Sequence, residues 1–412
     1  MTADINARRL LDRIEAFASI GGNAGGGVSR EGFSASDLEA RERLSKEAQL
    51  GGMDAAVDAA GNVLIRRPGG GRGAESRRVL LIGSHLDTVA NGGRLDGAYG
   101  VLAGLEVMQT IVESGAEPAY EPVLVAFANE EGALFPQPFW GSTVLAGALE
   151  MLPDDPRDHD GRSLRRPLAL AGGDLAALST AVWLAESVAA YLELHVEQGP
   201  VLERSGRPIG VVDSITGRTL LTVEVRGSAG HAGTTPMNLR RDPLPTAARI
   251  VLAAQDLACE RRLCRVTTVG WVEVHPNSPN TIADSVRLTI DLRDSDPSRL
   301  ENAEEALRTS LASLDKQADV HIDIRVDTRA APVATDPALR AAITASADEL
   351  GLPHQTLPSG AGHDAQIVAR IAPIGMIFVP SIGGVSHVPE EDTADTDLLA
   401  GARVLLRTVL RL

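Results

Sequence analysis

Polar residues with catalytic or metal-binding chemistry follow three mainly apolar segments of this 412-residue chain. The first segment, residues 79–82, has no polar alternation, which is typical of a strand buried on both faces of a sheet. Residues 123–128 and 191–196 have a similar character. The polar pairs at the ends are His85 with Asp87, Glu130 with Glu131, and His195 with Glu197. Because parallel strands place their carboxyl ends at one edge of a sheet, where α/β proteins bind ligands, we predict that these pairs lie side by side.

Asp96 and His387 extend this set of candidate ligands. Nitrogen and oxygen ligands without thiolates suit zinc, manganese, cobalt or nickel. Two such ions about 3.5–4 Å apart need a carboxylate that bridges them, and a free carboxylate that takes a proton from water. The adjacent Glu130 and Glu131 can divide these two tasks. An isolated Glu-Glu pair is more often a solvated turn, but this pair follows an apolar strand and precedes Gly132.

A single histidine at a strand end, such as His85, is more often a capped surface residue than a metal ligand. Asp87 is placed to hold the His85 imidazole in one tautomer, as carboxylates behind metal-bound histidines do. Three strands that end in such pairs rarely arise by chance, and this repetition favours the metal site.

Helices and strands alternate around these segments. We expect an amphipathic helix within residues 5–17, a second helix that begins near Ser36, and a hairpin at the Gly61-Asn62 turn. Asp336 and Pro337 have the N-cap and N1 pattern of a further helix. The remaining expected elements are helices at about 98–114, 175–190, 338–350, 363–371 and 397–410, and a strand at 374–379.

Residues from about 220 to 326 have a different order of elements: strand, helix, two strands, helix, strand. This βαββαβ order is the ferredoxin-like arrangement and is long enough for a separate domain. The expected fold class is therefore α/β, with a catalytic domain built from residues 1–213 and 332–412. A ferredoxin-like domain at residues 214–331 is inserted into it.

Composition excludes several classes of partner. The length favours two domains, and 44% hydrophobic with 23% charged residues is ordinary for a folded α/β protein. A formal charge of −16 and only 12 aromatic residues argue against nucleic acid. No apolar run approaches the roughly 20 residues that span a bilayer, and the N-terminus lacks the apolar core of a secretory signal. Cys259 and Cys264 form neither a CxxC pair nor a disulfide framework, so we expect a cytoplasmic location.

Seven motifs resemble the hydantoinase/carbamoylase family of zinc-dependent, exopeptidase-like amidohydrolases. They are GSHLDTV, GGRLDGAYGV, NEEG, ELHVEQGPVLE, GSAGHAGTTPM, SGAGHDAQ and FVPSIGGVSHVPEED. The similarity extends from about residue 35 to the end. Members of this family include N-carbamoyl-L-amino acid hydrolases, allantoate amidohydrolases and β-ureidopropionases. The resemblance implies a zinc-peptidase-like mixed sheet with helices on both faces, and an inserted lid and dimerisation domain.

The resemblance also implies a site with two divalent metal ions, zinc or else manganese, cobalt or nickel. The implied ligands are His85 and His195 for one ion, Glu131 and His387 for the other, and Asp96 as the bridge. Glu130 corresponds to the general base. The residues implied around the substrate are Gln198, Arg218, His231, Asn280, Arg293 and the backbone of Gly362.

Two of these residues have simpler interpretations from sequence alone. Arg293 follows a strand, and its planar guanidinium suits a substrate carboxylate, although most such arginines are solvated charges. His231 lies in a Gly-rich loop, where a histidine usually bonds to the backbone. The resemblance instead implies that His231 completes the active site of the partner subunit in a homodimer, as a donor to the forming oxyanion.

The implied reaction is hydrolysis of the carbamoyl C–N bond of N-carbamoyl amino acids or related ureido acids, which releases amino acid, ammonia and carbon dioxide. Allantoate amidohydrolase, or an aminoacylase or dipeptidase on the same dinuclear site, is the alternative. A catalytically inactive binding protein would lack a ligand or the base, yet all are present. One departure leaves the substrate open: many relatives have Ser-Arg where this chain has Ala133-Leu134.

Overall fold

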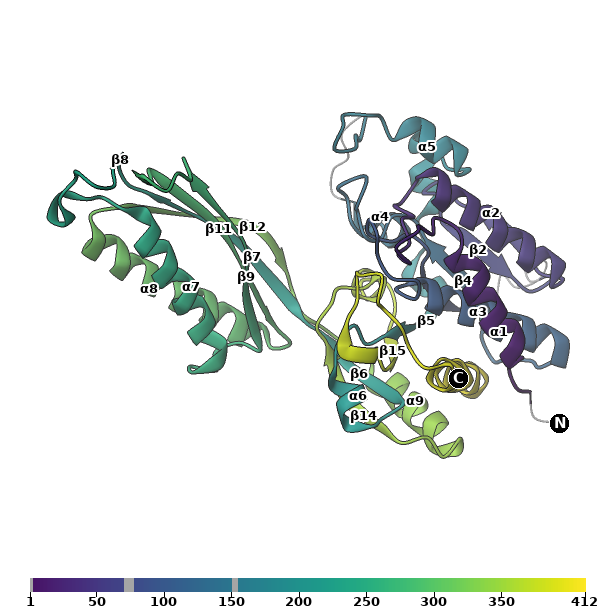
Figure 1. Cartoon of the computed structure of the whole chain (residues 1–412). Helices are drawn as coiled ribbons and strands as arrows, with labels where there is room; N and C mark the ends of the chain where they lie inside the picture. Colours follow the sequence, from purple (N-terminus) through teal and green to yellow (C-terminus); the bar gives the residue numbers. More distant parts are fainter. Residues whose placement is uncertain (1–2, 70–77, 150–154) are drawn as a thin grey trace. The chain divides into compact units, whose positions relative to one another are not determined.

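The structure is a computed structural model, which describes residues 3–69, 78–149 and 155–412 (Figure 1). The chain divides into two compact units. Unit 1 comprises Met1–Asp213 and Thr335–Leu412, and unit 2 comprises Ser214–Ala334. Within the described ranges, no helix is long and apolar enough to cross a membrane.

A nine-stranded mixed sheet, counted over the described residues, has the order β1-β2-β4-β3-β5-β15-β6-β13, with β14 paired to β6. Its central strands β4, β3, β5 and β15 are parallel neighbours, whereas β2 joins β4 and β6 joins β15 in antiparallel fashion. The strands are β1 (Asp54–Val57), β2 (Val63–Arg66), β3 (Val79–His85), β4 (Glu121–Phe127), β5 (Val188–Val196), β6 (Ile209–Ile215), β13 (Val333–Ala334), β14 (His354–Ser359) and β15 (Ile374–Val379). The predicted α/β class with a mixed sheet is thus confirmed.

Helices cover this sheet, which explains the missing alternation in its central strands. All seven residues of β4 are buried, so both of its faces are covered. The main apolar core packs Leu80 and Leu192 of the sheet against helical residues such as Leu102 and Leu405. The helices of unit 1 are α1 (Ala7–Ala18), α2 (Ala35–Leu50), α3 (Ala98–Ser114), α4 (Trp140–Leu145), α5 (Arg165–Leu170), α6 (Val201–Ser205), α9 (Pro337–Glu349), α10 (Asp364–Val368) and α11 (Asp395–Arg411).

Three local expectations differ from the structure. The helix expected at 175–190 is wrong: short 3₁₀ turns at Leu175–Ala181 and Ala185–Ser187 precede β5. Val188 and Ala190 pair with Val79 and Leu80 of β3, and this sheet pairing overrides helical propensity. The cap of α2 is Ser34 rather than Ser36, since the Ser34 side chain accepts a hydrogen bond from Asp37 N. Helix α10 ends three residues earlier than expected, at Val368.

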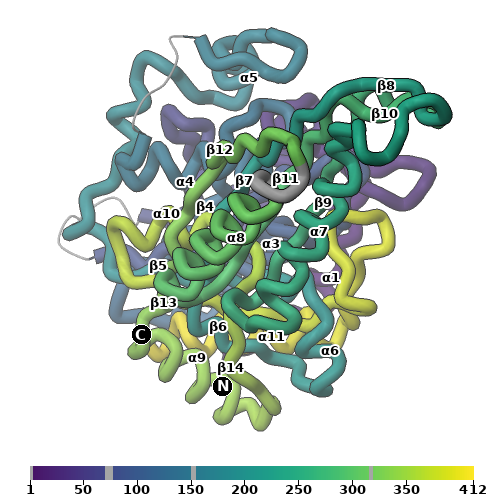
Figure 2. Tube along the Cα trace, turned by 90° about the vertical axis from the view of Figure 1, so that its left-hand side faces the viewer, coloured from purple at the N-terminus to yellow at the C-terminus, as the bar shows by residue number. Residues whose placement is uncertain are grey.

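Unit 2 contains an antiparallel sheet of four strands over its described residues, in the order β12-β7-β11-β9. Helices α7 and α8 lie side by side on one face of this sheet (Figures 1 and 2). Strand β11 alternates buried and more exposed residues, as a strand covered on one face should. The elements are β7 (Gly217–Arg226), β8 (Gly230–His231), α7 (Pro243–Cys259), β9 (Val266–His275), β10 (Thr281–Ile282), β11 (Ser285–Asp294), α8 (Pro297–Ala318) and β12 (His321–Ala330).

Candidate metal centre

The carboxyl ends of the parallel strands in unit 1 gather the candidate ligands at one edge of the sheet. His85 is the last residue of β3, and His195 is the penultimate residue of β5. Glu130 and Glu131 follow β4, the other neighbour of β3. The predicted side-by-side arrangement of the three strand ends is therefore confirmed by the strand order.

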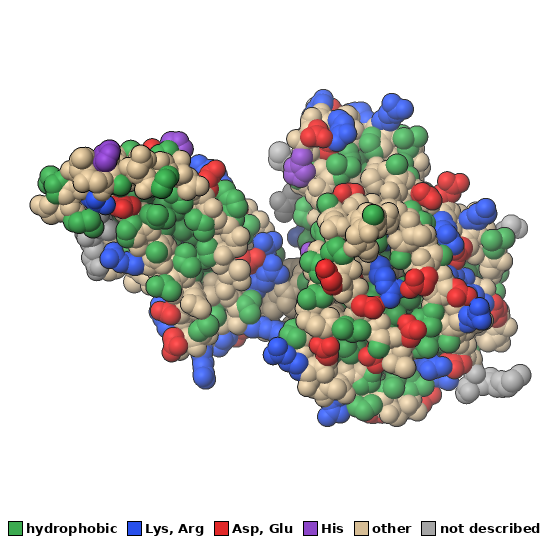
Figure 3. Space-filling model, in the orientation of Figure 1, with side chains coloured by type: hydrophobic (Ala, Val, Ile, Leu, Met, Phe, Trp, Pro, Cys, Tyr) green, Lys and Arg blue, Asp and Glu red, His purple; other side chains and the backbone are tan. Residues whose placement is uncertain are grey.

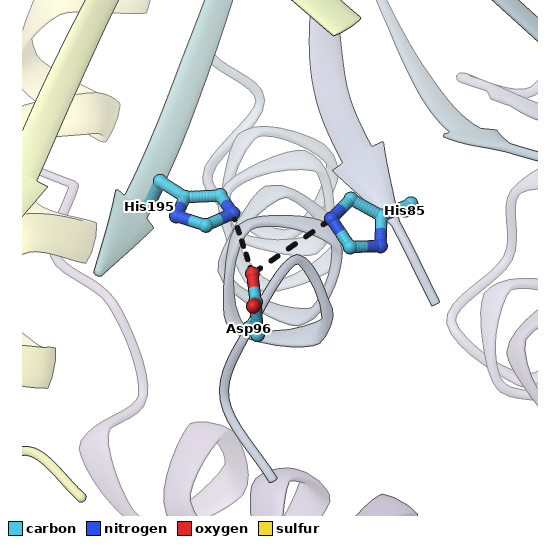
Figure 4. A group of neighbouring side chains, drawn as sticks. All are labelled: His85, Asp96 and His195. Atoms are coloured by element: carbon cyan, nitrogen blue, oxygen red, sulfur yellow. Dashed lines mark ion pairs between the residues drawn. The ribbon is translucent and has the colours of Figure 1, made fainter. Parts of the chain in front are cut away.

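Asp96 lies between the two strand histidines, just before α3 (Figure 4). Its Oδ1 atom is 3.2 Å from His195 Nε2 and 3.9 Å from His85 Nε2. Its Oδ2 atom is 2.9 Å from Nε2 of His387, which is itself 3.4 Å from Glu131 Oε1. One carboxylate oxygen thus faces one group of ligand atoms and the other oxygen faces a second group. A carboxylate that bridges two metal ions has this arrangement.

Gly97 allows Asp96 to approach the histidines. It has a φ of 62°, in the left-handed region that favours glycine. A Cβ atom at this position would lie 2.4 Å from the His85 ring. A side chain at residue 97 would therefore displace the ring or the helix start.

Main-chain carbonyls orient both strand histidines. His85 Nδ1 lies 2.9 Å from Asp87 O, and His195 Nδ1 lies 2.9 Å from Val196 O. Each Nδ1–H donates to its carbonyl, which leaves each Nε2 lone pair directed toward the Asp96 side of the site. This is the tautomer that metal-bound histidines require.

The Asp87 side chain has a different role from the one that we predicted. Its carboxylate is 3.9 Å from His85 Nδ1, too far for a hydrogen bond, and the Asp87 carbonyl holds the ring instead. The two carboxylate oxygens accept hydrogen bonds from the backbone N–H groups of Glu130 and Glu131, each at 3.1 Å. Asp87 can do this because β3 and β4 are adjacent. It therefore fixes the loop that carries both glutamates.

Buried carboxylates dominate the electrostatics of the site. Asp96 and Glu130 are 3% and 6% exposed. Burial raises the pKa of Glu130 well above its usual range, and the negative charges of Glu131 and Asp364 reinforce this. Burial likewise raises the pKa of Glu131 to about 8. Divalent cations would compensate this concentration of negative charge, so the donor atoms and the charge both fit such ions.

Of the predicted substrate residues, Gln198 and Gly362 lie in unit 1. Gln198 Nε2 donates to Asp96 Oδ2 at 2.9 Å, and Gln198 Oε1 is buried without a hydrogen-bond partner. Gly362 lies against Phe139, whose Cζ atom would be 3.0 Å from a Cβ at residue 362. A side chain at residue 362 would therefore press against the Phe139 ring.

The other four predicted substrate residues lie in unit 2, in two pairs. Arg218 and Arg293 face each other across β7 and β11, and both bond to the Asp291 carboxylate. His231 and Asn280 are joined through the β8–β10 ladder, where Ala232 N donates to Asn280 O at 3.0 Å.

Sequence reasoning missed a polar layer behind His195. Glu193 lies on the same buried strand and accepts hydrogen bonds from Ser84 Oγ and Ala365 N. The His363 ring packs against the His195 ring with centroids 4.7 Å apart. A glutamate inside an otherwise apolar strand was the available signal.

Four residues of this region have a strained backbone. Asn129, Phe139, Gln198 and His387 have φ values between 53° and 61°, in a region that non-glycine residues rarely adopt. Such strain is characteristic of functional sites, where surrounding contacts enforce it.

Ala133 and Leu134, where the sequence departs from the expected family motif, follow Gly132 after the glutamate pair. Leu134 packs against an apolar cluster that includes Phe33, Phe135 and Trp140. The Leu134 side chain therefore contributes to the packing of this apolar cluster.

Comparison with known proteins identifies the protein family. The family model described as Peptidase family M20/M25/M40 matches residues 81–411. The chain belongs to this family. An N-carbamoyl-L-amino acid amidohydrolase of Geobacillus stearothermophilus is 39% identical over 99% of each chain. An allantoate amidohydrolase of Bacillus subtilis is 36% identical, covering 98% of this chain and 97% of the relative. A hydantoinase/carbamoylase family amidase of Burkholderia multivorans has a TM-score of 0.91 at 35% identity, covering 100% of this chain and 98% of the other.

Membership of this family makes the chain a hydrolytic enzyme, and the resemblance noted in its motifs is confirmed. Divalent metal binding agrees with both the family and the clustered ligands.

Proposed function

We propose that this protein is an amidohydrolase with two divalent metal ions, zinc or else manganese, cobalt or nickel, and that it cleaves the ureido C–N bond of N-carbamoyl amino acids. The observation that carries the proposal is the division of ligands around Asp96. Among the described residues, two groups of side chains that could hold a metal ion share this carboxylate: one adds His85 and His195, and the other adds Glu131 and His387. Asp96 is the bridging ligand in this proposal.

Glu130 is the general base. It is absent from the described groups of clustered ligands, although its Oε2 atom lies 3.8 Å from His85 Nε2. Its backbone N–H donates to Asp87 Oδ1, which fixes the chain segment that carries the Glu130 carboxylate. Divalent ions held by Asp96, the three histidines and Glu131 would supply a water molecule with its pKa lowered towards ~7 and a polarised substrate carbonyl. Glu130 accepts a proton from the attacking water and returns it to the leaving nitrogen.

The residues of unit 2 bind the rest of the substrate in this proposal. Arg218 and Arg293 present guanidinium groups from adjacent strands, which suits a substrate carboxylate. His231 Nδ1 accepts a hydrogen bond from Gly233 N at 3.0 Å. The ring proton is therefore on Nε2, where it can be donated to an oxyanion. Gln198, Asn280 and Gly362 complete the proposed substrate contacts.

We assign residues 1–213 and 332–412 to a metal-binding catalytic domain and residues 214–331 to a ferredoxin-like lid and dimerisation domain. The strand order of unit 2 and its two helices on one face support the second assignment. The free thiols of Cys259 and Cys264 support a reducing, cytoplasmic location.

Exposed apolar side chains along the β9 edge of unit 2 support a homodimer. Strand β9 is at the end of the strand order, and α7 packs beside it. Val266, Trp271 and Val272 of β9 are 44–49% exposed, and Leu252 of α7 is 59% exposed. Hydrophobic side chains are visible over the surface of this unit in Figure 3. Because an edge strand with exposed apolar side chains readily pairs with another chain, we propose that two copies associate through this edge.

Allantoate is the second candidate substrate. The relative named allantoate amidohydrolase is 36% identical, close to the 39% of the N-carbamoyl-L-amino acid amidohydrolase. Both substrates are linear ureido acids, so one site can serve either.

An ammonia-release screen tests the substrate class. The panel should contain N-carbamoyl-α-amino acids, N-carbamoyl-β-alanine and allantoate, with amine release measured separately for dipeptides and N-acyl amino acids. We expect the highest kcat/KM for an N-carbamoyl-α-amino acid. Highest turnover of allantoate would select the second candidate. Turnover of dipeptides or N-acyl amino acids alone would contradict the ureido assignment.

A further inference from the structure

Glu391 is a buried carboxylate in the loop that carries His387. It is 2% exposed and lies four residues after that histidine. Its Oε1 atom accepts hydrogen bonds from Leu95 N at 3.0 Å and from Asp96 N at 2.9 Å. Glu391 therefore holds the backbone of the residue that lies at the centre of the metal site.

The second oxygen of Glu391 reaches the same centre through a serine. Ser386 Oγ donates to Glu391 Oε2 at 2.5 Å and lies 3.3 Å from Asp96 Oδ2. Gln198 Nε2 lies 3.3 Å from Ser386 Oγ and donates to Asp96 Oδ2 at 2.9 Å. The backbone and the carboxylate of Asp96 are thus both linked to Glu391.

The loop that precedes α3 fits closely around this carboxylate. A Cβ atom at Gly93 would lie 2.1 Å from Glu391 Oε1, so only glycine leaves room for the carboxylate. On the same two loops, Arg94 Nη2 and Asp392 Oδ1 form an ion pair at 2.7 Å. The loops that carry Asp96 and His387 are therefore fastened together at more than one point.

His387 needs such a restraint. Its φ of 61° lies in the left-handed region, and its side chain is 48% exposed. Burial and strand pairing hold His85 and His195, but they do not hold His387. A strained, half-exposed ligand depends on contacts of the neighbouring residues for its position.

A buried carboxylate beside Asp96 has a cost in folding free energy, because both groups are acidic. Packing alone gives no reason for a glutamate there. We propose that Glu391 is a positioning residue, which sets the bridging carboxylate of Asp96 and the ligand His387 at the separation required for two ions. This inference rests on the dinuclear site proposed above.

Zinc titration of metal-stripped, full-length protein tests the inference, with a chelating indicator as competitor. The variants are Glu391→Ala, Glu391→Gln and Ser386→Ala, and Glu390→Ala is the matched control on an exposed neighbouring glutamate. We expect Glu391→Ala to weaken the binding of one zinc ion about 10- to 100-fold, the usual effect of losing a group that orients a ligand. Glu391→Gln should restore most of that affinity, because its amide oxygen can still accept both backbone N–H bonds. Ser386→Ala should have an intermediate effect, and Glu390→Ala should match wild type.

The thermal midpoint of each metal-free variant separates positioning from general stability. The positioning role is supported if zinc affinity decreases from wild type to Glu391→Gln to Glu391→Ala while the thermal midpoints of the metal-free proteins do not follow this order. Unchanged affinity for both ions in Glu391→Ala and Ser386→Ala would overturn this inference alone. If Glu391→Ala does not fold, equal zinc affinity of Ser386→Ala and wild type overturns it. Wild-type protein that binds fewer than two ions would overturn the proposed function and this inference together.

Discussion

Glu130 is the residue with the most specific proposed role, since we assign it as the general base and not as a metal ligand. Glu130→Gln keeps the size and the backbone contact to Asp87 but removes the base. We expect metal content to stay at the wild-type value while kcat falls on the order of 10² to 10⁴-fold, the typical contribution of a general base. Metal analysis and steady-state kinetics on the same preparation measure both quantities.

Glu131→Gln is the matched control, because the adjacent glutamate is assigned to a metal ion. It should lose bound metal as well as activity. A Glu130→Gln variant within threefold of wild-type kcat would show that another group moves the proton.

At the same scale, the sequence predicted which residues gather but not all of their contacts. His85, Glu130 and His195 could be found because each follows an apolar run whose strand end has a defined place in a parallel sheet. The contact of the Asp87 carboxylate with the Glu130 and Glu131 amides could not be found, since it depends on the path of the chain after β3. Glu391 is a further example, because its partners Leu95 and Asp96 lie almost 300 positions earlier.

Strand β11 is the element that tests substrate binding. Its more exposed face presents Arg287, Asp291 and Arg293, and the last of these lies opposite Arg218 of β7. Arg293→Ala should lower kcat/KM for a substrate with a free carboxylate at least about tenfold, since a charge-assisted hydrogen bond contributes roughly 1.5–3 kcal/mol. For the corresponding substrate amide, kcat/KM of the wild type should already be lower by a similar factor. The Arg293→Ala variant should lower it little further.

Arg287→Ala is a control on the same strand and the same face. Arg287 is near Glu273, with 3.6 Å between the charged atoms, and has no role in the proposed site. It should leave kcat/KM unchanged. Equal wild-type activity on acids and amides would remove Arg293 from carboxylate recognition.

Elements with strong local signals were predicted best. The Asp336 side chain caps α9 through Ala338 N and Leu339 N, as its Asp-Pro pattern indicated. The segment 175–190 was missed because its composition is compatible with a helix, whereas the chain there makes short turns and then joins β5. Local propensity cannot show that Val188 and Ala190 pair with β3, a strand about 110 positions earlier in the chain.

The whole molecule is proposed to act as a homodimer in which His231 serves the partner's site. His231→Ala should lower kcat roughly 10²-fold or more, the scale of one lost oxyanion donor. Mixed dimers of Glu130→Gln and His231→Ala chains then distinguish the two possible arrangements. If His231 acts across the interface, one site of the mixed dimer has both an intact base and an intact donor, so part of the activity returns.

The two inactive homodimers, measured at the same total concentration, are the controls for that mixing experiment. Absence of recovery in verified heterodimers would contradict the cross-subunit role. A wild-type chain that is monomeric in solution at assay concentration would contradict the proposed dimer itself.

The dinuclear metal centre is the central claim, and metal analysis of the purified protein joined to activity measurements tests it most directly. We predict two divalent ions per chain, loss of turnover on chelation, and recovery when the ions are restored. His85→Ala and His387→Ala should each reduce the metal content, because each removes one proposed ligand. The two histidines lie in different ligand groups around Asp96. Full activity in protein shown to be free of metal, or no more than one ion per chain in the active enzyme, would contradict the dinuclear centre.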